Sequence, residues 1–180
     1  VLFAVMWNTG ARIGALHGLD VDDWHPEDEI GYLAFHHRPE TDTPLKLKQD
    51  GERQVTITRP SIAKALNAYT EWKRHPITEE SGRQPLFTST QDRVSTSNIR
   101  TQTYLATQPC RYRNECPENK EIDTCEYRRT THCSKCPVSV SPHPIRRTAI
   151  MYHIQNDVPK EIVAERMGTS VKIINRNYDK

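Results

Sequence analysis

Three short segments with strand character lie close together between residues 32 and 58, and this clustering limits the fold more than any other feature. They are residues 32–37, 45–48 and 53–58. In the last of them Val55 and Ile57 alternate with Gln54 and Thr56, as in a strand with one buried face. Residues 49–52 supply a turn between the second and third segments, so antiparallel pairing is expected. The sequence therefore predicts one small three-stranded antiparallel sheet.

Helical periodicity dominates the rest of the chain. The clearest helix is predicted over residues 61–75, where apolar residues recur along one stripe. Shorter helices are predicted over residues 2–6, 11–19, 98–108, 144–156, 160–168 and 171–179. Along the sequence, helices come before and after the strands of the small sheet. This order favours an α+β fold in which helices predominate. The apolar start, VLFAVMW, reads as the buried end of a helix, so we expect residues 1–180 to be one domain from a longer protein.

Composition excludes a membrane-spanning protein and leaves the partner open. Charged residues make up 27% of the chain, and no apolar run approaches the roughly 18 residues that span a bilayer. The first residues lack the basic segment and cleavage site of a signal peptide. We therefore expect a cytoplasmic protein with no membrane partner. The net charge of +2 is too small to establish a polyanionic partner, which would require clustered basic residues.

His143 and Arg146 stand three residues apart at the predicted start of a helix, so both fall on one helix face. The helix N-terminus adds a positive end at which an anion docks. An arginine donates two parallel hydrogen bonds to a phosphate, and a histidine transfers a proton near neutral pH. Tyr178, near the last residue of the sequence, is a competent covalent nucleophile. The set points to phosphodiester cleavage, although each residue taken singly also fits an ordinary surface position.

Together with the segment TGARI at residues 9–13, these residues resemble the tyrosine recombinase family, also called phage-type integrases. The family's T-G-x-R-[IL] segment assigns its first phosphate-binding arginine to Arg12. Its H-x-x-R motif matches His143 to Arg146, and its terminal nucleophile matches Tyr178. The motifs follow the family's order over nearly the whole chain. The resemblance implies that residues 1–180 form a tyrosine recombinase catalytic domain.

The resemblance also implies a lysine in the β-hairpin that protonates the leaving 5′ oxygen. Lys46 and Lys48 both occupy the corresponding place, and on a strand their spacing puts them on the same face. The sequence TPLK slightly favours Lys46, but hairpin length varies too much to decide between the two lysines.

By this resemblance the chain is expected to cleave and rejoin DNA at specific sites through a 3′-phosphotyrosyl intermediate. The implied partner is double-stranded DNA, with four protomers acting on two duplexes. No cofactor is needed for catalysis, because the phosphotyrosine conserves the bond. Two alternatives stay open: a zinc-containing DNA-binding module that has lost catalysis, and a type IB topoisomerase, which shares the chemistry. The sequence does not reveal the DNA site, or whether the role is integration, excision or dimer resolution.

Two positions depart from the family pattern. The family has L-G-H nine residues before the nucleophile, whereas this chain has Met167-Gly168-Thr169. Thr169 therefore stands where a phosphate-binding histidine or tryptophan is usual. A threonine hydroxyl can donate a hydrogen bond, but losing one preorganised donor costs about 3 kcal/mol in well-studied sites, so slow chemistry is expected. Ala15 stands where an acidic residue usually supports the first arginine.

All five cysteines lie within residues 110–136, in an insertion at about residues 109–138 that looks similar to one in some archaeal integrases. Clustered cysteines in a cytoplasmic protein favour a metal over disulfides, and zinc prefers four thiolates or three with a histidine. Cys133 and His132 stay open as ligands, as do free thiols or oxidised pairs. The preferred ligands of a structural zinc are Cys110, Cys116, Cys125 and Cys136.

Overall fold

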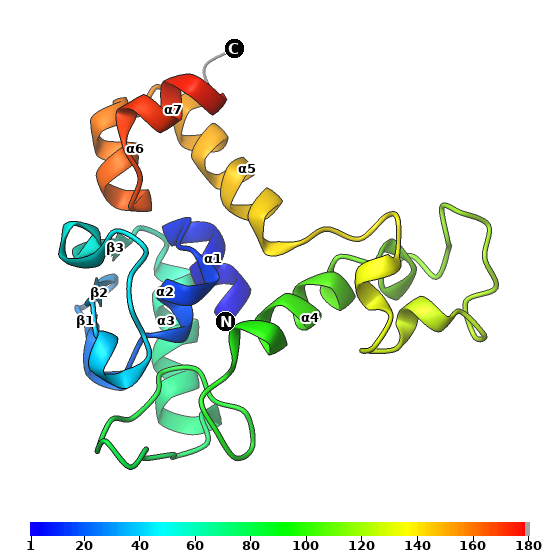
Figure 1. Ribbon diagram of the computed structural model, residues 1–180, viewed down its shortest axis with the longest axis horizontal. Coiled ribbons are helices and arrows are strands. Elements are labelled where there is room, and N and C mark those ends of the chain that lie inside the picture. Colours follow the sequence, from blue (N-terminus) through cyan, green and yellow to red (C-terminus); the bar gives the residue numbers. More distant parts are fainter. Residues whose placement is uncertain (179–180) are drawn as a thin grey trace.

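The computed structural model describes residues 1–178 and arranges the helices around one small sheet (Figure 1). The strands are β1 (Trp24–Pro26), β2 (Gly31–Phe35) and β3 (Arg53–Ile57). The helices are α1 (Leu2–Thr9), α2 (Ile13–His17), α3 (Pro60–Ala68), α4 (Thr96–Ala106), α5 (Pro142–Gln155), α6 (Lys160–Met167) and α7 (Val171–Tyr178). A π-helical turn, Tyr69–Lys73, extends α3. Each predicted helix is present, and the predicted extension to Asp179 lies outside the described residues.

The strands form one antiparallel sheet in the order β1-β2-β3, which confirms the predicted α+β class. Leu33 on β2 pairs with Trp24 on one side and with Val55 on the other. Trp24 lies in β1, which is not one of the three predicted strands. Its indole is buried and its Nε1 donates to Asn67 Oδ1 at 2.7 Å, so one anchored aromatic residue is enough to fix a three-residue strand.

The predicted strand at residues 45–48 is wrong. Only Leu45 of the two leucines is buried, and the chain then enters a 3-10 turn, Lys48–Gly51, in which Lys48 has a φ of 52°. The Leu45 amide donates to His37 Nδ1 at 3.0 Å, so it is not available to a neighbouring strand. Lys46 and Lys48 therefore do not share a strand face.

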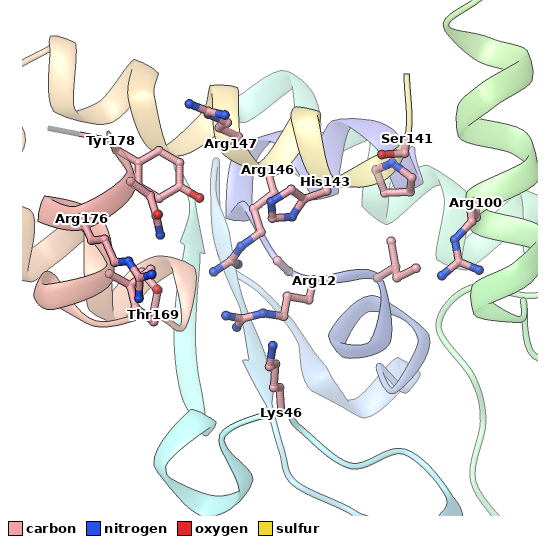
Figure 2. A pocket seen from close by; sticks show the side chains of 15 residues that line it. Arg12, Lys46, Arg100, Ser141, His143, Arg146, Arg147, Thr169, Arg176 and Tyr178 are labelled. Carbon is pink, nitrogen blue, oxygen red and sulfur yellow. The ribbon is translucent and has the colours of Figure 1, made fainter. Parts of the chain in front are cut away.

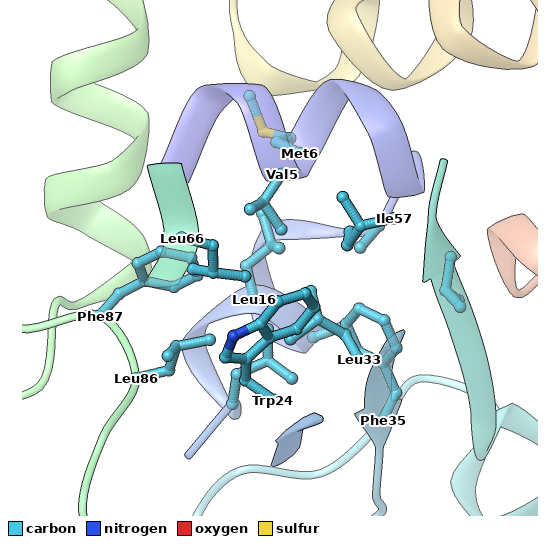
Figure 3. Packing of buried hydrophobic residues seen from close by; sticks show 14 of the residues in the cluster. Val5, Met6, Leu16, Trp24, Leu33, Phe35, Ile57, Leu66, Leu86 and Phe87 are labelled. Atoms are coloured by element: carbon cyan, nitrogen blue, oxygen red, sulfur yellow. The ribbon is translucent and has the colours of Figure 1, made fainter. Parts of the chain in front are cut away.

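A hydrophobic core joins the sheet to the first three helices (Figure 3). Leu33, Val55 and Ile57 from the inner face of the sheet pack with Leu16 of α2 and Leu66 of α3. Leu86 and Phe87, from the loop after α3, close the same core. This half of the molecule holds α2 and β3 in fixed relation.

A second, smaller core lies between the last three helices. It contains Ala149 and Ile150 of α5, Val163 and Met167 of α6, and Ile174 of α7. Helix α1 lies between the two cores, because Val5 and Met6 face the first while Trp7 packs against the second. The end of the chain is thereby brought beside its beginning.

Residues 107–141 leave the rest of the molecule at the end of α4 and return at the start of α5 (Figure 1). Within this insertion the structure shows only short 3-10 turns, at Pro109–Arg111, Glu126–Arg128 and Cys133–Lys135. Over residues 1–178, no helix is long and apolar enough to cross a membrane.

Candidate active site

A cavity of about 730 Å³ opens where α2, α5 and α7 approach one another (Figure 2). Cationic side chains dominate its lining, and none of the described residues that line it is an aspartate or a glutamate. The ionisable members are Arg12, Lys46, Arg100, His143, Arg146, Arg147, Arg176 and Tyr178. Six permanent cations without a carboxylate create a strongly positive field, which favours an anionic ligand.

The turn between α1 and α2 places Arg12 at the cavity. Gly10 ends α1 with a φ of 57°, and a Cβ there would lie 1.8 Å from Sδ of Met167. Thr9 Oγ1 accepts a hydrogen bond from the Ala11 amide at 3.2 Å and so tightens the turn. Arg12 is then the N-cap residue of α2 with extended backbone, rather than an interior residue of the predicted helix. The TGAR segment is therefore a device that turns one arginine inward.

Arg12 is supported by backbone instead of by an acidic side chain. Its Nη1 donates to the carbonyl oxygen of Gly168 at 2.6 Å, and Ala15 is simply buried in the first core. Burial lowers the pKa of Arg12, partly opposed by the nearby Tyr178. A carboxylate would neutralise the guanidinium, whereas a carbonyl oxygen orients it and leaves its charge available to a ligand.

Arg146 is the most deeply buried of the cavity arginines, with 5% of its surface exposed. Its Nη1 donates to the carbonyl oxygens of Gly10 and Met167, and its Nη2 lies 3.5 Å from that of Gly168. Burial, and then the charges of Arg12 and Arg53, lowers the pKa of Arg146 to about 9. The folded chain therefore holds a positive charge that its own groups do not neutralise.

Gly168 ties the two arginines together. It ends α6 with a φ of 58°, and its carbonyl oxygen accepts from Arg12 and lies within reach of Arg146. A Cβ at this position would lie 2.9 Å from Cζ of Arg53. The residue thus needs both the left-handed backbone and the missing side chain.

Arg53 is a third buried guanidinium that the sequence reasoning missed. Its Nε donates to the Arg166 carbonyl oxygen at 3.1 Å, and its guanidinium lies 4.3 Å from the centre of the Phe35 ring. Burial, together with the charge of Arg12, lowers the pKa of Arg53 to about 10. Period-two alternation was the available signal, because it puts residue 53 on the same face of β3 as Val55.

His143 and Tyr178 reach the cavity from two different helices. His143 lies in the first turn of α5, one turn before Arg146, and both line the cavity as their spacing predicted. Tyr178 is the last residue of α7, and its side chain points toward Arg146 and His143 (Figure 2). The Arg147 guanidinium lies 5.9 Å from the centre of the Tyr178 ring. Arg147 therefore contacts the tyrosine, whereas Arg146 faces the cavity floor.

The structure separates the two candidate lysines. Lys46 is exposed at the cavity edge and points toward Arg12 (Figure 2). Lys48 begins the 3-10 turn and lies outside the described lining. This difference favours Lys46 as the residue that contacts a ligand in the cavity.

Thr169 also lines the cavity, beside Arg176 (Figure 2). Arg100 of α4 and Arg176 of α7 belong to the lining as well, and the sequence reasoning did not single them out. No local pattern marks them, because each reaches the cavity only through the packing of its helix. Arg176 brings a positive charge to the side of the cavity that Thr169 lines.

The four preferred cysteines, Cys110, Cys116, Cys125 and Cys136, all line a second, small cavity of about 10 Å³ inside the insertion. Cys133 lies elsewhere, buried, with its Sγ 3.2 Å from the Thr130 carbonyl oxygen. His132 Nδ1 lies 3.7 Å from Glu126 Oε2, and neither lines the small cavity. All five cysteines are free thiols, and in residues 1–178 no three metal-binding side chains approach closely enough to coordinate an ion.

Solved structures share this architecture at low sequence identity. XerA recombinase superposes with a TM-score of 0.63 at 19% identity, covering 98% of this chain and 51% of that one. The Tn1549 transposon integrase in complex with a circular intermediate DNA superposes with a TM-score of 0.67 at 13% identity, covering 98% of this chain and 52% of that one. XerH site-specific recombinase bound to palindromic difH substrate superposes with a TM-score of 0.63 at 12% identity, covering 97% of this chain and 40% of that one.

The chain thus spans about half the length, or less, of the solved structures that it matches. No protein-family model matches the sequence, and no curated protein matches it either. The likeness to these solved structures is therefore one of three-dimensional arrangement, over almost the whole chain. That arrangement is the fold of the tyrosine recombinase catalytic domain.

Proposed function

We propose that this chain is the catalytic domain of a site-specific DNA recombinase that cleaves and rejoins DNA through a 3′-phosphotyrosyl bond. The observation that carries the proposal is the cavity: six cations, a histidine and a tyrosine line it, and none of the described lining residues is acidic. A phosphodiester is the ligand that such a field favours. The Tyr178 hydroxyl, directed at the buried guanidinium of Arg146, is the available nucleophile.

The proposed cleavage step balances without a metal or a nucleotide. The Tyr178 oxygen attacks the phosphorus and loses its proton, while the bond from phosphorus to the 5′ oxygen breaks. The leaving 5′ oxygen takes up a proton and becomes a hydroxyl. Rejoining is the reverse, because the 5′ hydroxyl of a second strand attacks the phosphotyrosine and releases Tyr178.

Each lining residue has a role that its position supports. Arg12 and Arg146, oriented by backbone carbonyl oxygens, stabilise the negative charge on the non-bridging oxygens. His143 donates to the same phosphate or exchanges protons with it. Lys46 protonates the 5′ oxygen, and Thr169 adds a neutral donor. The neutral donor is expected to make the chemistry slower than a histidine would.

Double-stranded DNA is the proposed substrate, and four copies are proposed to act on two duplexes. The Tn1549 integrase and XerH structures contain DNA, which supports a DNA partner for a chain of the same fold. Strand exchange between two duplexes requires four cleavages, and each copy carries one Tyr178. Four copies supply one nucleophile for each strand.

The test is capture of a covalent adduct. The protein is incubated with nicked suicide duplexes whose core sequence is randomised, each labelled at the 5′ end of the cleaved strand. Wild type is expected to give a labelled protein band that survives denaturing electrophoresis. Tyr178→Phe abolishes the band, whereas the matched Tyr152→Phe, at an exposed position outside the cavity on α5, retains it. Equal bands from wild type and Tyr178→Phe contradict the proposal.

The two lysines are distinguished by changing the leaving group. Lys46→Ala is expected to lower adduct formation by about 100-fold or more, because a general acid contributes on that order, whereas Lys48→Ala has little effect. A substrate with sulfur in place of the bridging 5′ oxygen leaves as a thiolate and needs no proton. Lys46→Ala is expected to regain near wild-type rates on this substrate. A Lys46→Ala defect that the sulfur substrate does not relieve assigns Lys46 to binding instead.

Two other outcomes separate the alternatives. If wild type binds duplexes from the randomised pool but forms no covalent adduct with them, the chain is a DNA-binding module that has lost catalysis. Tyr178-dependent relaxation of supercoiled plasmid at a first-order dependence on protein concentration, without exchange between duplexes, indicates a type IB topoisomerase activity. Recombinant joints between two labelled duplexes support the recombinase.

A further inference from the structure

The insertion is held in shape with almost no hydrophobic core. In residues 109–140, as far as the structure describes them, Cys133 is the one fully buried residue, and neither an α-helix nor a strand is present. The insertion is held by turn hydrogen bonds, such as those from the Asn119 and Cys136 amides, and by a few side-chain hydrogen bonds, such as Gln108 Nε2 to the Tyr127 carbonyl oxygen at 2.7 Å. Segments of this size that lack a core need another source of stability, usually a disulfide or a metal.

The cysteines supply an arrangement that fits this need. Cys110, Cys116, Cys125 and Cys136 come from four separate turns, up to 26 positions apart in the sequence, and yet line one cavity. The cavity volume of about 10 Å³ matches one small sphere, comparable to the space that a single water requires. The cavity is also lined by Pro117, Tyr127, Pro137 and Val138, so the four thiols meet in a small, largely apolar space.

We propose that these four cysteines bind one zinc ion and that the ion holds the insertion in its folded shape. Zinc takes four thiolates in tetrahedral geometry at about 2.3 Å. The thiols surround the cavity without yet reaching that geometry. Binding draws the four sulfur atoms inward as they lose their protons, so metal affinity and folding of the insertion are coupled.

The surroundings of the cavity suit the charge of such a site. Four thiolates and one zinc ion carry a net charge of −2, which needs compensation in a partly buried place. Lys120 and Arg128 line the same cavity, and the Lys120 ammonium lies 4.3 Å from the centre of the Tyr127 ring. Glu118 also lines the cavity, so the two cations face one carboxylate besides the four thiolates, and they offset part of the negative charge of the proposed site.

The site is structural because all four ligands come from protein, which leaves no position for substrate. Its position nevertheless connects it to the large cavity. The ends of the insertion meet where Val140 donates its amide hydrogen to Thr107 Oγ1 at 2.9 Å, and Ser141 and Pro142 then enter the cavity lining. An insertion fixed by zinc therefore fixes the point at which α5 starts, one residue before His143.

The test is metal content and ligand identity in the purified chain. Elemental analysis is expected to give one zinc per chain, and cobalt substitution is expected to give the visible absorption of a tetrahedral four-thiolate site. Serine at any of the four positions, as in Cys116→Ser, abolishes the cobalt spectrum. Cys133→Ser is the matched control from the same segment and retains one metal. Absence of bound metal after preparation with zinc, or loss of metal in Cys133→Ser but not in Cys116→Ser, overturns the proposal.

If the serine variants fail to fold, a measurement on the wild-type chain still tests the proposal. Mercurial titration of the thiols is expected to release one zinc after four cysteines react, while Cys133, which is 2% exposed, reacts last. Release that parallels reaction of Cys133, or disulfide-linked thiols in place of reactive ones, contradicts the four-thiolate site. These readouts do not involve DNA, so the zinc proposal and the proposed recombinase function can fail independently.

Discussion

The insertion and the arginine-lined cavity are stabilised in opposite ways. Around the cavity, two hydrophobic cores fix the helices, and buried guanidiniums are held by carbonyl oxygens at the ends of α1 and α6. The insertion, residues 109–140, has one buried residue and consists of turns, with four cysteines lining one small cavity. Removing a core residue is expected to weaken the whole first region, whereas removing the proposed zinc ion is expected to unfold the insertion. The difference shows that a chain can attach a separately stabilised segment to a packed domain without extending its core.

The largest expected effect separates the two regions directly. Chelation of zinc is expected to raise amide hydrogen exchange in residues 110–136 by more than about 1,000-fold, because structural zinc supplies about 10 kcal/mol or more in small metal domains. The β2–β3 ladder keeps its protection, since its amides rest on the first core. Mass spectrometry of exchanged peptides measures both regions in one experiment. Equal loss of protection in the sheet would show that the two regions form one cooperative unit.

The next effect concerns the residue that joins the arginines. Gly168→Ala is expected to lower the free energy of unfolding by about 1–3 kcal/mol, because alanine at a φ of 58° is strained and meets Arg53. It also shifts the carbonyl oxygen that orients Arg12, so adduct formation falls about 100-fold.

Gly14→Ala is the matched control for this substitution. Nothing lies within 4 Å of a Cβ at position 14, which is inside α2, so stability is expected to stay constant or rise by up to about 1 kcal/mol. Chemical denaturation of both variants measures the difference. Identical stability of the two variants would contradict the role of Gly168 in orienting Arg12 and Arg146.

The smallest effect comes from the unneutralised charge. Below about pH 9, Arg146 and Arg53 are protonated in both the folded and unfolded chain, and the folded chain bears their repulsion. As pH rises through 9 to 10, the folded chain releases protons that the unfolded chain keeps to a higher pH, so the free energy of unfolding rises. Bound sulfate offsets the repulsion, so its stabilising effect is greatest at neutral pH and declines above about pH 9.

A thermal shift of roughly 2–4 °C is expected from about 1 kcal/mol of sulfate binding at neutral pH in a chain of this size. Chloride at equal ionic strength is the control, because it screens the charges to the same extent and so separates screening from sulfate binding in the cavity. Arg12→Gln is expected to lose the specific shift while it retains the general stabilisation that sulfate gives to any folded protein. A shift that is the same in both proteins at every pH places sulfate outside the cavity.

The sequence was sufficient for features that depend on local periodicity. The apolar stripe over residues 61–75 and the alternation around Val55 predicted α3 and β3, because helix and strand faces repeat at fixed intervals. The spacing of His143 and Arg146 likewise predicted one helix face for both, and both line the large cavity. These features require no knowledge of what packs against them.

Features that depend on distant partners escaped the sequence. Residues 45–48 alternate like a strand, but their amides are engaged by side chains and turns. Trp24 lies in a strand that pairs with β2, and its indole donates to Asn67, far along the chain. Arg53, Arg100 and Arg176 meet at or beside the cavity through packing of three separate elements. Tertiary context decides such positions.

The carbonyl oxygen of Gly168 has a consequence for the order in which the protein becomes competent. It is the acceptor for Arg12, which the ribosome makes 156 positions earlier. A nascent or prematurely terminated chain can fold the sheet and present the TGAR turn, yet it lacks both the acceptor and Tyr178. The proposed cleavage site is therefore complete only once Gly168 and Tyr178 are in place, and proteolytic removal of α6 and α7 would remove both at once.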